Sequence, residues 1–111
     1  MKSITRRILI QLGLSPKYKG YTALVEAVNL YIEFPNTKIT AIYELAGRKL
    51  YSSYSKVERN IRKAITVILD RNDEDLLYKI FGFNVLSSGT IINGDFISCL
   101  AAYVQEVNEH E

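Results

Sequence analysis

The chain has 111 residues, of which 48% are hydrophobic, and its formal net charge is +2. This length and composition exclude global disorder and predict a single domain, residues 1–111, with a packed core. One cysteine excludes an internal disulfide, one cysteine with one histidine excludes a structural zinc site of these residues, and no stretch approaches the ~20 apolar residues of a membrane helix. We therefore expect a cytoplasmic protein without a membrane segment, metal or cofactor.

Apolar residues recur at helical spacing in six segments, which predicts a compact all-α domain of six helices. The expected helices span residues 3–12, 21–34, 38–50, about 54–70, 73–80 and 94–107, with a short link at 51–54 before the fourth helix. Ser3 is expected to cap the first helix and Gly13 to end it. Gly47 lies inside the third helix at a cost of ~1 kcal/mol relative to alanine, which predicts that another helix approaches closely there. Residues 81–92 contain two glycines and are expected to be irregular, with room for a small hairpin.

The charges are unevenly distributed along the chain. Residues 38–69 carry seven Lys/Arg and two Asp/Glu, whereas residues 70–111 carry two Lys/Arg and eight Asp/Glu. The basic part and the acidic part are therefore expected to meet different partners.

The segment 52–71 is strongly amphipathic when it is drawn as a helix. One side carries Val57, Ile61, Ala64, Ile65 and Ile68, and the other carries Ser55, Glu58, Arg59, Arg62 and Thr66, with Lys56 and Lys63 on its flank. A charged helix face is often merely solvated, but here the cations are grouped and a helix with a short link precedes them. This layout predicts a helix-turn-helix whose recognition helix, at about residues 54–70, enters the major groove of double-stranded DNA.

Individual roles follow from the chemistry of DNA contacts. Arginine pairs edge-on with guanine, so Arg59 and Arg62 are candidates for base contacts. Glu58 leaves two alternatives open, because it can form a capping box with Ser55 or accept a hydrogen bond from cytosine N4. The candidates for phosphate contacts are Lys56, Lys63, Arg48, Lys49, Lys17, Lys19 and Ser55.

The sequence contains no set of residues that forms an active site. The one histidine, His110, lies next to the end of the chain, which argues against a serine or cysteine triad. Glu26 and Glu33 are seven residues apart and are expected on a solvated helix face rather than in an acid/base pair. We therefore predict that the chain is not an enzyme.

The segment SKVERNIRKAI, residues 55–65, closely resembles the "SRVERAIRHAI" signature of a known family. That family is the C-terminal effector domain of the master response regulator of endospore formation in Firmicutes. Further similarities are KGY at 19–21, Ile39-Thr40 with Tyr43, FGFNV at 81–85 and NGDFI at 93–97, so the resemblance spans nearly the whole chain.

The resemblance implies a six-helix domain that binds short promoter boxes, often as tandem dimers. It implies that Glu58, Arg59 and Arg62 contact bases or adjacent phosphates, with Lys56 beside them. It further implies that the segment containing Phe81 contacts the sigma factor of RNA polymerase and that the last helix takes part in a homodimer on DNA.

The chain also departs from the family pattern. The family's regulators carry a phosphorylated receiver domain, which these residues do not include, so control by phosphorylation is not carried over. Glu44 replaces a family proline, and Tyr54 replaces an alanine in the turn, where its ring either packs or stacks on DNA. The alternative function is a protein-interaction module that modulates a full-length regulator or RNA polymerase without binding DNA.

Overall fold

The computed structural model describes residues 1–82 and 93–111 of the chain. These residues form six α-helices and no strand, and the radius of gyration is 12.9 Å, as expected for a compact chain of this length. The helices are α1 (Lys2–Gln11), α2 (Lys19–Glu33), α3 (Ile39–Lys49), α4 (Tyr54–Arg71), α5 (Glu74–Phe81) and α7 (Asn93–Glu109). The predicted all-α class with six helices is confirmed for these residues. The small hairpin expected within 81–92 falls mainly on residues 83–92, outside the described residues.

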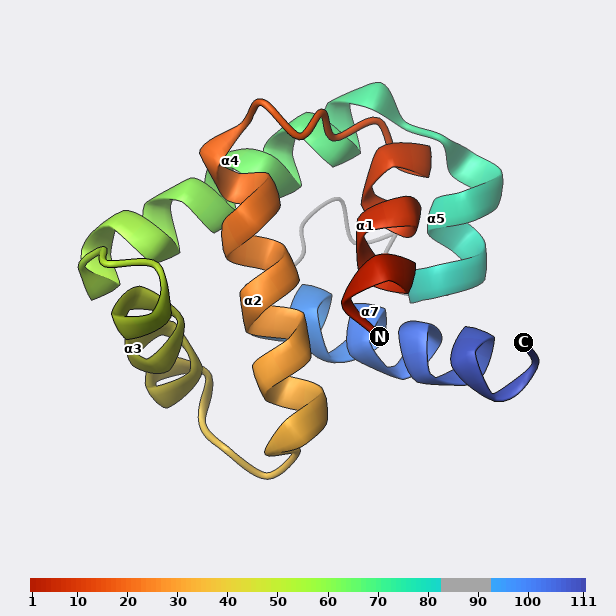
Figure 1. Cartoon of the computed structure of the whole chain (residues 1–111). Coiled ribbons are helices and arrows are strands. Elements are labelled where there is room, and N and C mark those ends of the chain that lie inside the picture. The colour runs from red at the N-terminus through yellow and green to blue at the C-terminus, as the bar shows by residue number, and fades with distance from the viewer. Residues whose placement is uncertain (83–92) are drawn as a thin grey trace.

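Helix α2 lies at the centre of the domain and contacts α1, α3, α4 and α7 (Figure 1). Much of its surface between Gly20 and Leu30 is buried, because most residues of this stretch are small or apolar. In Figure 1, α3 and the beginning of α4 lie on one side of α2, and α1 and α5 lie on the other. The α3–α4 pair is therefore placed at one end of the molecule.

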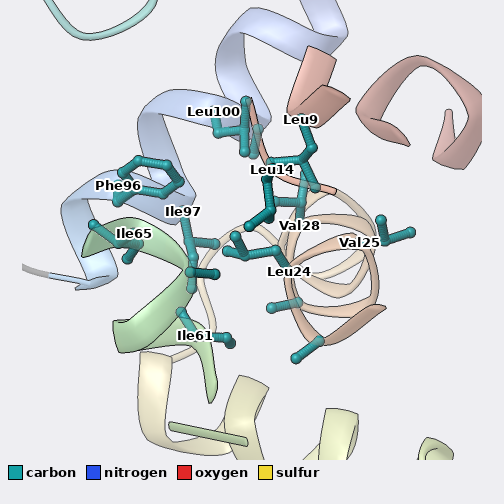
Figure 2. Close-up of a cluster of buried hydrophobic side chains, with 14 of the residues drawn as sticks. Leu9, Leu14, Leu24, Val25, Val28, Ile61, Ile65, Phe96, Ile97 and Leu100 are labelled. Carbon is teal, nitrogen blue, oxygen red and sulfur yellow. The ribbon is translucent and has the colours of Figure 1, made fainter. Parts of the chain in front are cut away.

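The core joins α2 to α4 and α7. In Figure 2, Leu24 of α2 extends toward Ile61 of α4 and Ile97 of α7, and all three side chains are fully buried. The predicted apolar side of α4 is entirely buried: Val57, Ile61, Ala64, Ile65 and Ile68. Since this side is fixed in the core, the opposite side of α4 must face solvent.

A close contact between two helices occurs at Gly20. A Cβ atom placed on Gly20 would lie 2.4 Å from the carbonyl oxygen of Asn60 and 2.5 Å from the Cβ of Ala64. The first turn of α2 therefore packs directly on the backbone of α4, which no side chain at this position would permit.

The expectation that Gly47 admits another helix was wrong. A Cβ atom there would lie 2.7 Å from the carbonyl oxygen of Ser52, which belongs to the turn after α3. The Ser52 N–H also donates to the Gly47 carbonyl oxygen at 2.8 Å. Gly47 thus makes room for the turn to fold back on its own helix.

Several helix ends differ from their predicted positions. Ser3 is not a cap, because α1 already begins at Lys2 and has no side-chain cap. Helix α2 begins at Lys19, two residues before the predicted start, and α7 continues to Glu109. Gly13 does follow the end of α1, with φ of +92°. In the described part of the chain, no helix is both long and apolar enough to cross a membrane.

Candidate nucleic-acid interface

The turn between α3 and α4 comprises residues 50–53 and is fixed by backbone hydrogen bonds. Leu50 N–H donates to the Ala46 carbonyl oxygen at 3.0 Å, and Ser52 N–H donates to that of Gly47. Tyr51 lies between them with a φ of +53°. These contacts determine where α4 begins and which of its side chains point away from the core.

Ser53, rather than Ser55, caps α4, so the predicted capping box was wrong. The Ser53 Oγ accepts a hydrogen bond from the Lys56 N–H at 3.2 Å, whereas Ser55 lies exposed inside the first turn. The turn geometry fixes Ser53 at the N-cap, and the residue three positions later is Lys56, which cannot complete a box. The Glu58 carboxylate is instead 3.5 Å from the Arg62 guanidinium, an i,i+4 pair.

We expect Ser53→Ala to lower the free energy of unfolding by about 1 kcal/mol, because the Lys56 N–H loses its acceptor at the helix end. Urea denaturation followed by circular dichroism measures this change. Ser55→Ala is the matched control, and it is expected to stay within about 0.5 kcal/mol of the wild type. A larger loss for Ser55→Ala than for Ser53→Ala would contradict the assignment of the cap.

The outward side of α4 is cationic and largely unpaired. Lys56, Arg59, Arg62 and Lys63 are all exposed. Among the described residues, only Arg62 of these four forms an ion pair, and its partner Glu58 is its sole acidic neighbour at pairing distance. Exposed pairs of this kind contribute at most ~1 kcal/mol. The positive charge on this side of α4 is therefore available to an anionic partner.

A hollow of about 480 Å³ lies beside this side of α4, against the start of α2. It brings together two of the predicted phosphate contacts, Lys19 from α2 and Lys63 from α4. The first turn of α2 has no side-chain cap. The remaining lining residues were not predicted from the sequence: Tyr18, Gly20, Asn60, Ala64, Thr66 and Val67. Asn60 could have been predicted to lie beside the cationic residues, because it is four residues after Lys56 and three before Lys63 on the same helix.

Three further predicted phosphate contacts, Arg48, Lys49 and Lys17, are exposed outside α4. Arg48 and Lys49 are exposed in the last turn of α3, where cations also favour the negative end of the helix dipole. Lys17 is exposed in the loop before α2, and its ammonium group lies 5.8 Å from the centre of the Tyr18 ring. These residues are accessible, but no ion pair or hydrogen bond links them to α4.

Three aromatic residues from the comparison with the family pattern, Tyr43, Tyr54 and Phe81, pack within the domain. Tyr54 meets the buried Tyr43 edge to face, with ring centres 5.6 Å apart, which supports the packing alternative for Tyr54. Burial raises the pKa of the Tyr43 hydroxyl, an effect that Asn93 of α7 partly offsets. Phe81 is buried and stacks on Phe96 at 4.7 Å. The Phe81 side chain is therefore not exposed for contact with another protein.

A comparison with protein families gives one match that covers most of the chain. The family model described as sporulation initiation factor Spo0A, C terminal, matches residues 5–104. That family is a DNA-binding regulatory domain and not an enzyme family. No solved structure matches the chain.

Proposed function

The chain belongs to the family of sporulation initiation factor Spo0A C-terminal domains, and from this premise we propose that it binds double-stranded DNA sequence-specifically as a transcription regulator. In this proposal α3 and α4 form a helix-turn-helix, with α4 as the recognition helix. The observation that supports this proposal is the difference between the two sides of α4. Its apolar side is buried, and its cationic side is exposed next to the turn. As a DNA-binding domain it acts in the cytoplasm.

The proposed contacts fall into two groups. Arg59, Arg62 and Glu58 contact base edges, since they lie on the outward side of α4 near its beginning. The second group contacts phosphates and holds the domain in register: Lys56, Lys63, Ser55, Arg48, Lys49, Lys17 and Lys19. The hollow between α2 and α4 supports this assignment for Lys19 and Lys63, because both residues line one concave surface beside the cationic side of α4.

The proposal predicts a steep dependence of DNA affinity on salt. A duplex with a randomised central segment is first enriched for binding to the protein, and the affinity for the enriched sequence is then measured at several salt concentrations. If about five phosphates are neutralised, log K falls with log salt at a slope near −4 to −5. A flat salt response contradicts DNA binding, and equal affinity for the enriched and scrambled duplexes contradicts sequence specificity.

The alternative is a protein-interaction module, and one surface favours it. Glu74 and Asp75 are exposed in the first turn of α5, outside the α3–α4 pair. In this alternative the acidic surface docks on RNA polymerase through its sigma factor, or on a full-length regulator. Reversing both charges to lysine would then abolish capture of the protein partner. Under the DNA-binding proposal the same variant retains its affinity for the enriched duplex.

A homodimer on DNA remains part of the proposal, with the last helix in the contact between the two copies. Native mass spectrometry of the complex with the enriched duplex measures how many copies bind. Two copies on one duplex support the dimer, whereas a single copy on every enriched duplex contradicts it.

A further inference from the structure

Tyr51 is unusual in both its backbone and its exposure. Its φ of +53° places it in the left-handed region, and its side chain is 98% exposed. Asn72, the other described non-glycine residue with positive φ, has a side chain that tolerates this region, whereas a bulky aromatic residue does not favour it. The Tyr51 ring therefore projects from the turn with almost no contact to its own domain.

The free domain gains nothing from a tyrosine at this position. A left-handed conformation costs roughly 1–2 kcal/mol for a residue with a Cβ atom, and glycine avoids this cost. A ring that stays in water contributes no burial energy to folding. The backbone N–H of Tyr51 donates to the Arg48 carbonyl oxygen, but the side chain has almost no internal contact. Strain of this kind beneath an unburied aromatic side chain points to a role in binding a partner.

The surroundings of Tyr51 favour DNA as that partner. Arg48 and Lys49 precede it, Lys56 follows it, and no acidic residue occurs between Glu44 and Glu58. The positive end of the α4 dipole begins three residues later, at Tyr54. A turn placed here, before the recognition helix, lies beside the sugar–phosphate backbone rather than over the base pairs.

We propose that Tyr51 is a DNA contact, an inference that rests on the proposed function of α4. Its hydroxyl group donates a hydrogen bond to a backbone phosphate oxygen, and its ring covers the adjoining sugar. Tyrosine is among the residues that form such phosphate contacts. The turn is then a third part of the interface, beside the outward side of α4 and the lysines of the hollow.

The test compares Tyr51→Gly and Tyr51→Asn with the wild type on the enriched duplex. Both variants tolerate the left-handed backbone, so Tm is expected to stay equal to that of the wild type or rise by a few degrees. DNA affinity is nevertheless expected to fall about five- to tenfold. A residue with a purely structural role would not lower affinity while stability is kept or increased.

The salt dependence provides a second readout. Because tyrosine is uncharged, Tyr51→Gly should leave the slope of log K against log salt unchanged, whereas Lys49→Gln should reduce its magnitude by about 1. Tyr51→Phe should lose part of the affinity, since it keeps the ring and lacks the hydroxyl. Tyr78→Ala, which alters an exposed tyrosine on α5, serves as the control with unchanged affinity.

Wild-type affinity for Tyr51→Gly on a duplex that the wild type binds would overturn the inference and leave the proposed function intact. A wild-type protein that binds no duplex would instead contradict the proposed function itself. A fall in affinity together with a clear fall in Tm would also overturn the inference, because the loss of binding would then come from loss of folded protein.

Discussion

Gly20→Ala is expected to lower the free energy of unfolding by about 3 kcal/mol and Tm by more than about 10 °C. The added methyl group would meet the Asn60 carbonyl oxygen at 2.4 Å and the Ala64 Cβ at 2.5 Å. The first of these atoms belongs to the α4 backbone, which cannot shift without moving Ile61 within the core. The substitution therefore separates α2 from α4, the two helices on which the position of the outward cationic side depends.

Thermal and urea denaturation measure this effect, and Gly94→Ala is the matched control. A Cβ atom at Gly94 would meet the nearest atoms of Ile39 at 3.8 Å, which is ordinary van der Waals contact. Gly94→Ala is therefore expected to be neutral or slightly stabilising. Adding Ala64→Gly to Gly20→Ala should restore only part of the stability, because the contact with Asn60 remains. If the free energy of unfolding of Gly20→Ala stays within about 0.5 kcal/mol of the wild type, α2 and α4 can move apart with little loss of stability, which contradicts this prediction.

The contrast between Gly20 and Gly47 shows what periodicity can predict about this fold. The helices follow from the spacing of apolar residues, and all five residues predicted for the inner side of α4 are buried. Periodicity does not say which helices meet, however. Gly20 lies just before the predicted second helix and was given no packing role, whereas Gly47 was predicted to be a helix contact. In the structure the helix contact is at Gly20, and the turn folds against Gly47.

The candidate interface was also predictable only in part. The sequence identifies which residues of α4 face outward, but not the features that depend on tertiary packing. A helical wheel identifies the outward residues of α4, since burial of one side determines the other. It does not choose among Ser52, Ser53 and Ser55 as the cap, because that choice depends on the hydrogen bond between Ser52 and Gly47. The hollow that joins Lys19 to Lys63 and the left-handed backbone of Tyr51 arise from tertiary packing and turn geometry, and neither has a local sequence signal.

Arg62→Ala is expected to weaken binding to the enriched duplex by 1–3 kcal/mol, roughly 5- to 150-fold, and to relax the preference for one base pair. In the free domain the Arg62 guanidinium lies 3.5 Å from the Glu58 carboxylate. Both side chains are partly or mostly exposed, at 28% for Glu58 and 62% for Arg62, so this pair is weak enough for a guanine to replace it. The change in affinity is not expected to come from folding, because exposed substitutions shift stability by only about 0.5 kcal/mol.

The measurement that distinguishes a base contact from a phosphate contact is a set of affinities for the enriched duplex and its single-base-pair variants. For Arg62→Ala, one of these variants should bind as well as the enriched sequence, while the other positions keep their preferences. Lys63→Ala is the matched comparison on the same side of α4, and it should weaken all duplexes equally and reduce the salt slope by about 1. An equal loss on every duplex for Arg62→Ala would assign Arg62 to the phosphate backbone. The base contacts of α4 would then be left to Arg59 and Glu58, because the Glu58 carboxylate, released from Arg62, can still accept a hydrogen bond from cytosine N4.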